Sequence, residues 1–202
     1  MRNEVSVGGI TAKPGTIAKG LWKISELYDG SSVEIPVAVI NGSEDGAILW
    51  AQSSVHGDEY VGTHAIQRLL LQVDPKEMKG AIIAIPWLNV LAYRWGTRGA
   101  PQDGMDMNRI WPGKPLDTAM HIFAHSELVV HEVFSEMRRL ADVVMDLHDG
   151  SVWQVESAYF GGQNVHRLTA APEVESSYPS GLGRRVEGLP LRAHPVRFSR
   201  CV

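Results

Sequence analysis

Apolar residues recur along the first 150 positions with two different periods, which predict alternating strands and helices. Continuous apolar runs are typical of strands buried in a sheet, and they predict four strands, at 33–40, 47–55, 81–85 and 143–147. Residues 59–73 and 117–140 instead space their apolar side chains three and four positions apart, as amphipathic helices do. Asp117 or Thr118 is expected to cap the second helix.

This order of elements implies an α/β fold, with a sheet that helices cover on both faces. A long connection at 89–116 interrupts the pattern and is rich in Gly, Pro, Asp and Arg. Connections of that length inside a compact domain are usually functional. Beyond residue 150 neither period persists, although residues 152–160 have the composition of one further strand.

The composition changes at the same point. Residues 1–150 contain all ten Asp of the chain, whereas residues 151–202 contain six Arg but no Asp and no Lys. We therefore expect residues 1–150 to be the folded part and residues 151–202 to be an atypical tail. A shifted reading frame and poor order are two explanations for such a tail.

Charge and cysteine content exclude several classes of protein. The formal charge of −4 provides no basic surface for nucleic acid and no polybasic membrane anchor. Cys201 is the only cysteine, which rules out an intramolecular disulfide and a cysteine-rich zinc site. Apolar stretches are too short to span a bilayer, so a cytoplasmic protein is expected.

Polar side chains gather where two predicted strands end. His56 and Glu59 follow the strand at 47–55, and His148 follows the strand at 143–147. Ligand sites of open α/β sheets lie beyond the carboxyl ends of the strands, so the three side chains can converge. Two imidazoles and one carboxylate form a catalytic zinc set, which another divalent metal could also occupy. The alternative is a capping carboxylate with two hydrogen-bonded loop histidines.

Other polar groups have weaker patterns. His121 and His125 are four residues apart, but without an intervening Glu of the H-E-x-x-H type we interpret them as part of a helix face. The long connection carries Asn108 and Arg109 side by side, an arrangement suited to binding a carboxylate. A second arginine there could stabilise an oxyanion. The alternative is that these loop charges face water.

Three segments together resemble the succinylglutamate desuccinylase/aspartoacylase family of the zinc carboxypeptidase clan. They are SVHGDEYVG at 54–62, DGMDMNRIWPG at 103–113 with Arg98 before it, and DLH at 146–148. The resemblance covers roughly residues 30–150. Its loop looks most similar to that of bacterial deacylases acting on N-acylated diamino acids or similar small amides. It implies a mixed sheet of the zinc-carboxypeptidase type, incomplete after the third zinc ligand.

The resemblance implies zinc-dependent hydrolysis of the amide bond of a small N-acyl amino acid. His56, Glu59 and His148 match the ligands of one zinc ion, which activates water for attack on the amide carbonyl. The expected partner is therefore a small-molecule substrate. Whether the protein also forms a homo-oligomer stays open.

Residues of the long connection match the substrate-binding groups of the family. Asn108 and Arg109 match the pair that binds the substrate carboxylate. Arg98 matches the arginine that polarises the scissile carbonyl, and Arg94 is a less well placed candidate.

One element of the family pattern has no match, namely the Glu that acts as general base and acid. Glu156 lies only eight residues beyond His148, which is too close, and three other glutamates lack the expected strand context: Glu173, Glu175 and Glu187. Two alternatives to the deacylase stay open, the second of which is the other common activity of the clan. The chain is a catalytically impaired relative that binds only metal and a carboxylate ligand, or it is a metallocarboxypeptidase acting on peptides.

Overall fold

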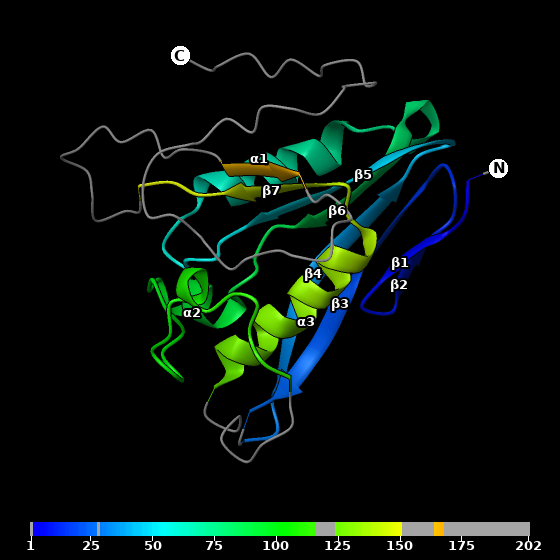
Figure 1. Ribbon diagram of the computed structural model, residues 1–202. Helices are drawn as coiled ribbons and strands as arrows, with labels where there is room; N and C mark the ends of the chain where they lie inside the picture. The colour runs from blue at the N-terminus through cyan, green and yellow to red at the C-terminus, as the bar shows by residue number, and fades with distance from the viewer. Residues whose placement is uncertain (1, 28, 116–123, 151–163, 168–202) are drawn as a thin grey trace. The chain divides into compact units, whose positions relative to one another are not determined.

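A six-stranded mixed sheet forms the centre of the computed structural model (Figure 1). The structure describes residues 2–27, 29–115, 124–150 and 164–167, all of which belong to one compact unit. In spatial order the strands are β3 (Thr16–Glu26), β4 (Ser32–Asn41), β6 (Lys79–Ile85), β5 (Glu44–Ser53), β7 (Val143–Leu147) and β8 (Asn164–Arg167).

Strand β5 is parallel to both of its neighbours, β6 and β7, whereas all other pairs in this sheet are antiparallel. Ser53 at the end of β5 pairs with Leu147 at the end of β7. Two strands that are distant in sequence therefore end at the same edge of the sheet, and the residues that follow them start from neighbouring positions.

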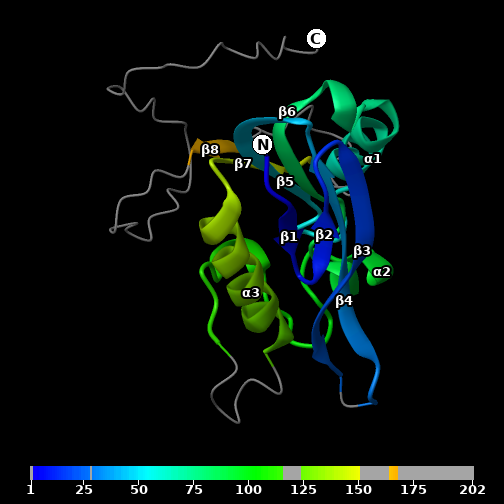
Figure 2. The same cartoon turned by 90° about the vertical axis from the view of Figure 1, so that its right-hand side faces the viewer.

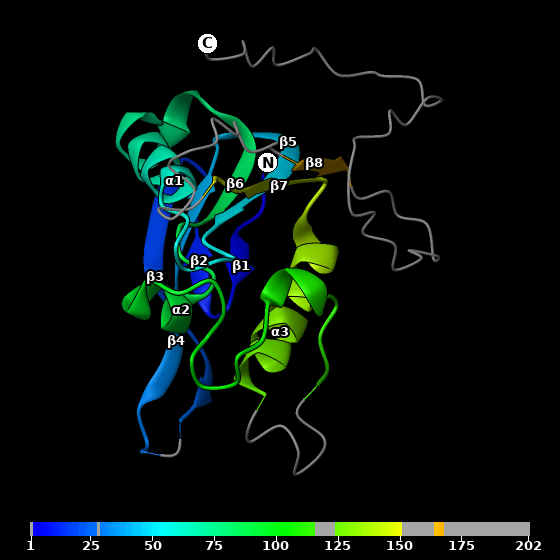
Figure 3. The ribbon, with the colours of Figure 1, turned by 90° about the vertical axis from the view of Figure 1, so that its left-hand side faces the viewer.

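Helices cover both faces of the sheet, as the sequence pattern predicted (Figures 2 and 3). On one face, Ile66 of helix α1 (Val61–Gln72) packs in a cluster with Ala84 of β6. On the other, Val133 of helix α3 (His125–Leu140) packs in a larger cluster that includes Ile83. Successive residues of a strand point to opposite faces, which explains why residues 81–85 of β6 are all apolar.

The N-terminal strands were not predicted from the sequence. A hairpin of β1 (Val5–Val7) and β2 (Ile10–Ala12) forms a separate two-stranded sheet whose apolar side chains join the α3 cluster. Strand β3 lies at the edge of the main sheet, and all of its residues except the buried Trp22 are exposed or partly buried. Such half-exposed strands contain too many polar residues for an apolar run to reveal them.

The long connection at 89–116 is more structured than expected. It contains helix α2 (Val90–Trp95) and a 3₁₀ turn, η2 (Met107–Arg109). A second 3₁₀ turn, η1 (Pro75–Glu77), lies outside this connection and precedes β6. Helix α3 starts at His125, and the two expected caps, Asp117 and Thr118, lie outside the described residues.

Of the proposed tail, only β8 at 164–167 is described, and the expected strand at 152–160 lies outside the described part. None of the described helices is both long and apolar enough to cross a lipid bilayer.

Gly62 in the first turn of α1 allows the helix to approach the strand ends closely. A Cβ atom at this position would lie 2.3 Å from Ser53 Oγ and 2.6 Å from Leu147 Cβ, both closer than side chains can pack. Any larger residue would therefore push the start of α1 away from the ends of β5 and β7.

Replacing Gly62 with Val is expected to lower the free energy of unfolding by about 1–3 kcal/mol, the usual cost of overpacking. Ala65, which is exposed on the same helix, provides the control, because Ala65→Val changes only helix propensity and costs at most about 0.7 kcal/mol. Denaturant unfolding monitored by circular dichroism measures both. Equal losses in the two variants would contradict the close contact.

Candidate functional site

The turn that follows β5 is held in a strained conformation by buried hydrogen bonds. Ser54 has a φ of +54°, which is uncommon for a residue other than glycine. Its hydroxyl group donates to the carbonyl oxygen of Glu59 at 3.0 Å and lies 2.8 Å from the hydroxyl of Thr63. These bonds close the turn, so that His56 and Glu59 lie on the same side of it.

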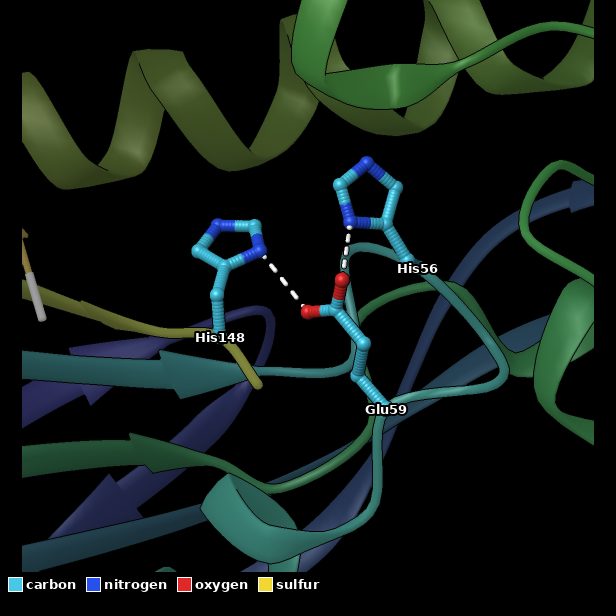
Figure 4. A group of neighbouring side chains, drawn as sticks. All are labelled: His56, Glu59 and His148. Atoms are coloured by element: carbon cyan, nitrogen blue, oxygen red, sulfur yellow. Dashed lines mark hydrogen bonds and ion pairs between the residues drawn. The ribbon is translucent and has the colours of Figure 1, made fainter. Parts of the chain in front are cut away.

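The three histidine and glutamate side chains predicted from the sequence come together at the ends of β5 and β7 (Figure 4). The carboxylate of Glu59 lies between two imidazoles, with Oε1 2.8 Å from His56 Nδ1 and Oε2 2.9 Å from His148 Nδ1. The three residues each offer one ligand atom, and these atoms lie within 4.8 Å of one another. His56 and Glu59 are buried and His148 is mostly buried.

A second carboxylate holds the far nitrogen of each imidazole. His56 Nε2 lies 3.0 Å from Asp106 Oδ1, and His148 Nε2 lies 3.0 Å from Asp146 Oδ2. Histidines that bind metals usually donate their other ring N–H to a carboxylate, which turns the lone pair of the first nitrogen toward the ion. Both imidazoles therefore have the partner that leaves Nδ1 available for a metal.

Hydrogen bonds decide the charges of the central residues. Burial favours the neutral form of Glu59, but the hydrogen bonds to His148 and His56 outweigh it and lower its pKa from 4.5 to about 2. Burial likewise lowers the pKa of His148, but the hydrogen bonds to Asp146 and Glu59 outweigh it and raise this pKa from 6.5 to about 10. A negative Glu59 thus faces a positive His148 at neutral pH.

Arg98 lies beside this group. Its Nε is 3.2 Å from Asp106 Oδ2 and one terminal nitrogen is 3.8 Å from Glu59 Oε1, while half of the side chain remains exposed. Asp106 therefore contacts both His56 and Arg98. Burial raises the pKa of the Asp106 carboxyl, but His56, the backbone N–H of Asn108 and, least, the charge of Arg98 together outweigh burial. The pKa of Asp106 therefore lies below its usual value.

The predicted substrate-binding pair lies in η2, directly after Asp106. The backbone N–H of Asn108 donates to Asp106 Oδ1 at 2.9 Å, and the exposed Arg109 donates to the carbonyl oxygen of Asn108 at 3.1 Å. No described contact joins the side chains of this pair to His56, Glu59 or His148. Arg94 is exposed on α2.

Asp106 and Asp146, the partners of the two imidazoles, lie within the motifs at 103–113 and 146–148, but no role was predicted for them. Asp146 and His148 are two residues apart at the end of a strand, and residues at this spacing face the same side, so their contact could have been predicted. The contact of Asp106 with His56 could not, because it depends on how the long connection folds.

Two other predictions concern residues away from the centre. His125 is buried at the start of α3, where its Nδ1 lies 3.4 Å from Ser25 Oγ, while His121 lies outside the described residues. The four glutamates considered as general base are also outside the described part: Glu156, Glu173, Glu175 and Glu187.

The donor set fits a zinc ion. Two imidazole nitrogens and one carboxylate form a set that zinc accepts while leaving a position open. Asp146, which contacts His148, is buried and has one carboxylate oxygen without a hydrogen-bond partner among the described residues. A divalent cation bound by the three central side chains would also interact favourably with this nearby carboxylate.

The chain is similar to the N-alpha-acetyl-L-2,4-diaminobutyric acid deacetylase of Halomonas elongata, at 33% identity over 137 residues, which cover 66% of this chain and 38% of that protein.

Two solved structures share the fold, which confirms the expected fold class. The succinylglutamate desuccinylase/aspartoacylase from Rhodobacter sphaeroides matches with a TM-score of 0.60 and 32% identity, covering 67% of this chain and 40% of the other. An aspartoacylase family protein from Mesorhizobium loti matches with a TM-score of 0.57 and 28% identity, covering 67% and 41%. The chain thus spans between 38% and 41% of the length of these three proteins.

The family profile described as the succinylglutamate desuccinylase/aspartoacylase catalytic domain matches residues 46–160, which is more than half of the chain. That stretch includes the strand ends, the long connection and the three central side chains. The chain belongs to the succinylglutamate desuccinylase/aspartoacylase family.

Proposed function

We propose that residues 1–150 form the N-terminal part of a catalytic domain that hydrolyses the amide bond of small N-acyl amino acids with the help of zinc. The observation that carries the proposal is the convergence of His56, Glu59 and His148, with Nδ1 of both imidazoles facing one carboxylate. The family membership and the deacetylase from Halomonas elongata support the reaction class.

His56, Glu59 and His148 would hold the metal. A zinc ion, when bound, supplies a Lewis acid that polarises a carbonyl group and makes water a nucleophile near neutral pH. Asp106 and Asp146 keep the two imidazoles oriented by accepting from Nε2. Other divalent metals accept the same donors, so the preference for zinc is part of the proposal.

Arg98 is the candidate for binding the carbonyl oxygen of the scissile amide. Its guanidinium group lies beside Glu59, is held by Asp106 and is half exposed, so it retains N–H donors for a ligand. A fixed positive group at this place would stabilise the oxyanion that forms when the carbonyl is attacked.

Asn108 and Arg109 are the candidates for the substrate carboxylate. The Arg109 side chain is exposed, and a guanidinium group binds a carboxylate through two parallel hydrogen bonds. The similarity to the N-alpha-acetyl-L-2,4-diaminobutyric acid deacetylase of Halomonas elongata and the sequence of the loop at 103–113 favour an N-acyl diamino acid as substrate.

The first prediction concerns the metal. Purified without chelator, the chain should contain one zinc ion per molecule, and His56→Ala should weaken zinc binding by more than about 100-fold, beyond the usual effect of losing an outer partner. His64, which is exposed on α1, provides the control, because His64→Ala should keep full zinc content. Metal analysis and chelator competition measure both, and a metal-free wild type would contradict the proposal.

The second prediction concerns Arg98. Arg98→Ala should lower kcat for deacylation by about 10²–10³, as expected for loss of an oxyanion donor, while zinc content stays unchanged. Arg94→Ala is the matched control and should have little effect. Kinetics should be measured on a panel of N-acyl diamino acids, other N-acyl amino acids and one peptide.

The same panel separates the alternatives. Release of a C-terminal amino acid from the peptide would favour the metallocarboxypeptidase. Zinc binding without turnover of any compound would favour the relative that only binds metal and a carboxylate ligand.

The third prediction concerns pH. A proton on His148 competes with the metal, and the raised pKa of about 10 means that this proton is present throughout the neutral range. Glu59 is already ionised above about pH 2 and adds no dependence there. Zinc affinity should therefore rise as pH rises from 6 to 9, by about tenfold for each proton released per pH unit. Calorimetry in buffers of different ionisation enthalpy measures the protons, and an affinity independent of pH would contradict it.

A further inference from the structure

Asp149, which follows His148, contacts the helix that Glu59 precedes. Its side-chain Oδ2 accepts a hydrogen bond from the backbone N–H of Val61 at 2.8 Å, in the first turn of α1. The two residues are far apart in sequence, so this bond ties the start of α1 to the end of β7.

Helix α1 has no cap from its own sequence. Its N-cap residue, Tyr60, makes no side-chain hydrogen bond to the helix, and the first turn contains no acidic residue. The first N–H groups of a helix need acceptors, and a carboxylate there also interacts favourably with the helix dipole. Asp149 supplies that carboxylate from another element.

The backbone of Asp149 contacts the central carboxylate as well. Its N–H donates to Glu59 Oε2 at 3.3 Å, and the same oxygen lies 2.9 Å from Nδ1 of His148. Two consecutive residues after β7 therefore hold Glu59 through its carboxylate, while the Asp149 side chain holds the helix that starts two residues later.

We propose that Asp149 is a positioning residue of the metal site, which fixes Glu59 relative to His148 by capping α1. Gly62 lets the first turn of α1 lie against Leu147, and the bond from Val61 to Asp149 keeps it there. Without that bond the turn carrying Glu59 gains freedom, and the two ligands must be brought together when the metal binds. The inference rests on the metal site proposed above.

The test measures zinc affinity by chelator competition together with the melting temperature. Asp149→Ala should bind zinc about 10- to 100-fold more weakly than the wild type, the usual effect of losing an outer partner of a metal ligand. Asp149→Asn retains an oxygen acceptor, and Asn caps helices about as well as Asp, so its zinc affinity should remain close to that of the wild type.

Asp142 offers a matched control at the start of β7. Its Oδ2 accepts from the backbone N–H of Ile48 at 2.8 Å, a bond of the same type and length that lies at the opposite end of β7 from the site. Asp142→Ala should lower the melting temperature without changing zinc affinity. If Asp149 had only a structural role, Asp149→Ala would likewise lower the melting temperature without changing zinc affinity, and this result would overturn the inference.

The outcomes separate this inference from the proposed function. A wild type that binds no zinc would overturn the metal site itself. A wild type that binds zinc as tightly as Asp149→Ala would overturn only the role of Asp149. Equal weakening in Asp149→Asn and Asp149→Ala would also overturn it, because charge and not the cap would then be responsible.

Discussion

Parallel pairing of β5 with β7 is the constraint on which the site depends. Because Ser53 lies opposite Leu147, the two strands end side by side, and the residues that follow them need only short turns to meet. His56 and His148 thereby become neighbours, with ring centroids 5.1 Å apart, although they are distant in the sequence. The helix between β5 and β6 must then start close to the same edge, which explains the glycine at position 62.

The second requirement is that a buried carboxylate needs positive partners. Glu59 is almost completely buried, and burying a charge without compensation is costly. The structure meets this requirement with two imidazoles and the nearby guanidinium group of Arg98. A divalent cation would satisfy the same carboxylate in place of its hydrogen bonds to the two imidazoles. The arrangement that makes Glu59 tolerable in the fold is therefore the one that suits it to metal binding.

Sequence patterns predicted the parts of the fold that are buried on both sides and the three polar residues that converge at the strand ends. β6 and β7 are short apolar runs, and His56, Glu59 and His148 follow strand ends, so their placement needed no knowledge of tertiary contacts. The hairpin β1–β2 and the edge strand β3 were missed because short or half-exposed strands leave little periodicity.

The supporting contacts were less predictable than the central residues. Helix α2 and the contact of Asp106 with His56 arise from the path of an irregular connection, which composition alone does not specify. The cap from Asp149 to Val61 likewise joins two segments whose proximity depends on the β5–β7 pairing. Local patterns thus indicate candidate ligands, whereas the bonds that orient these side chains follow from the tertiary fold.

Anomalous diffraction at the zinc edge from crystals of the full chain grown with zinc tests the central claim most directly. The account predicts one strong peak that is bonded to Nδ1 of His56, a carboxylate oxygen of Glu59 and Nδ1 of His148. A peak at other residues, or bonds through the Nε2 atoms that face Asp106 and Asp146, would contradict it.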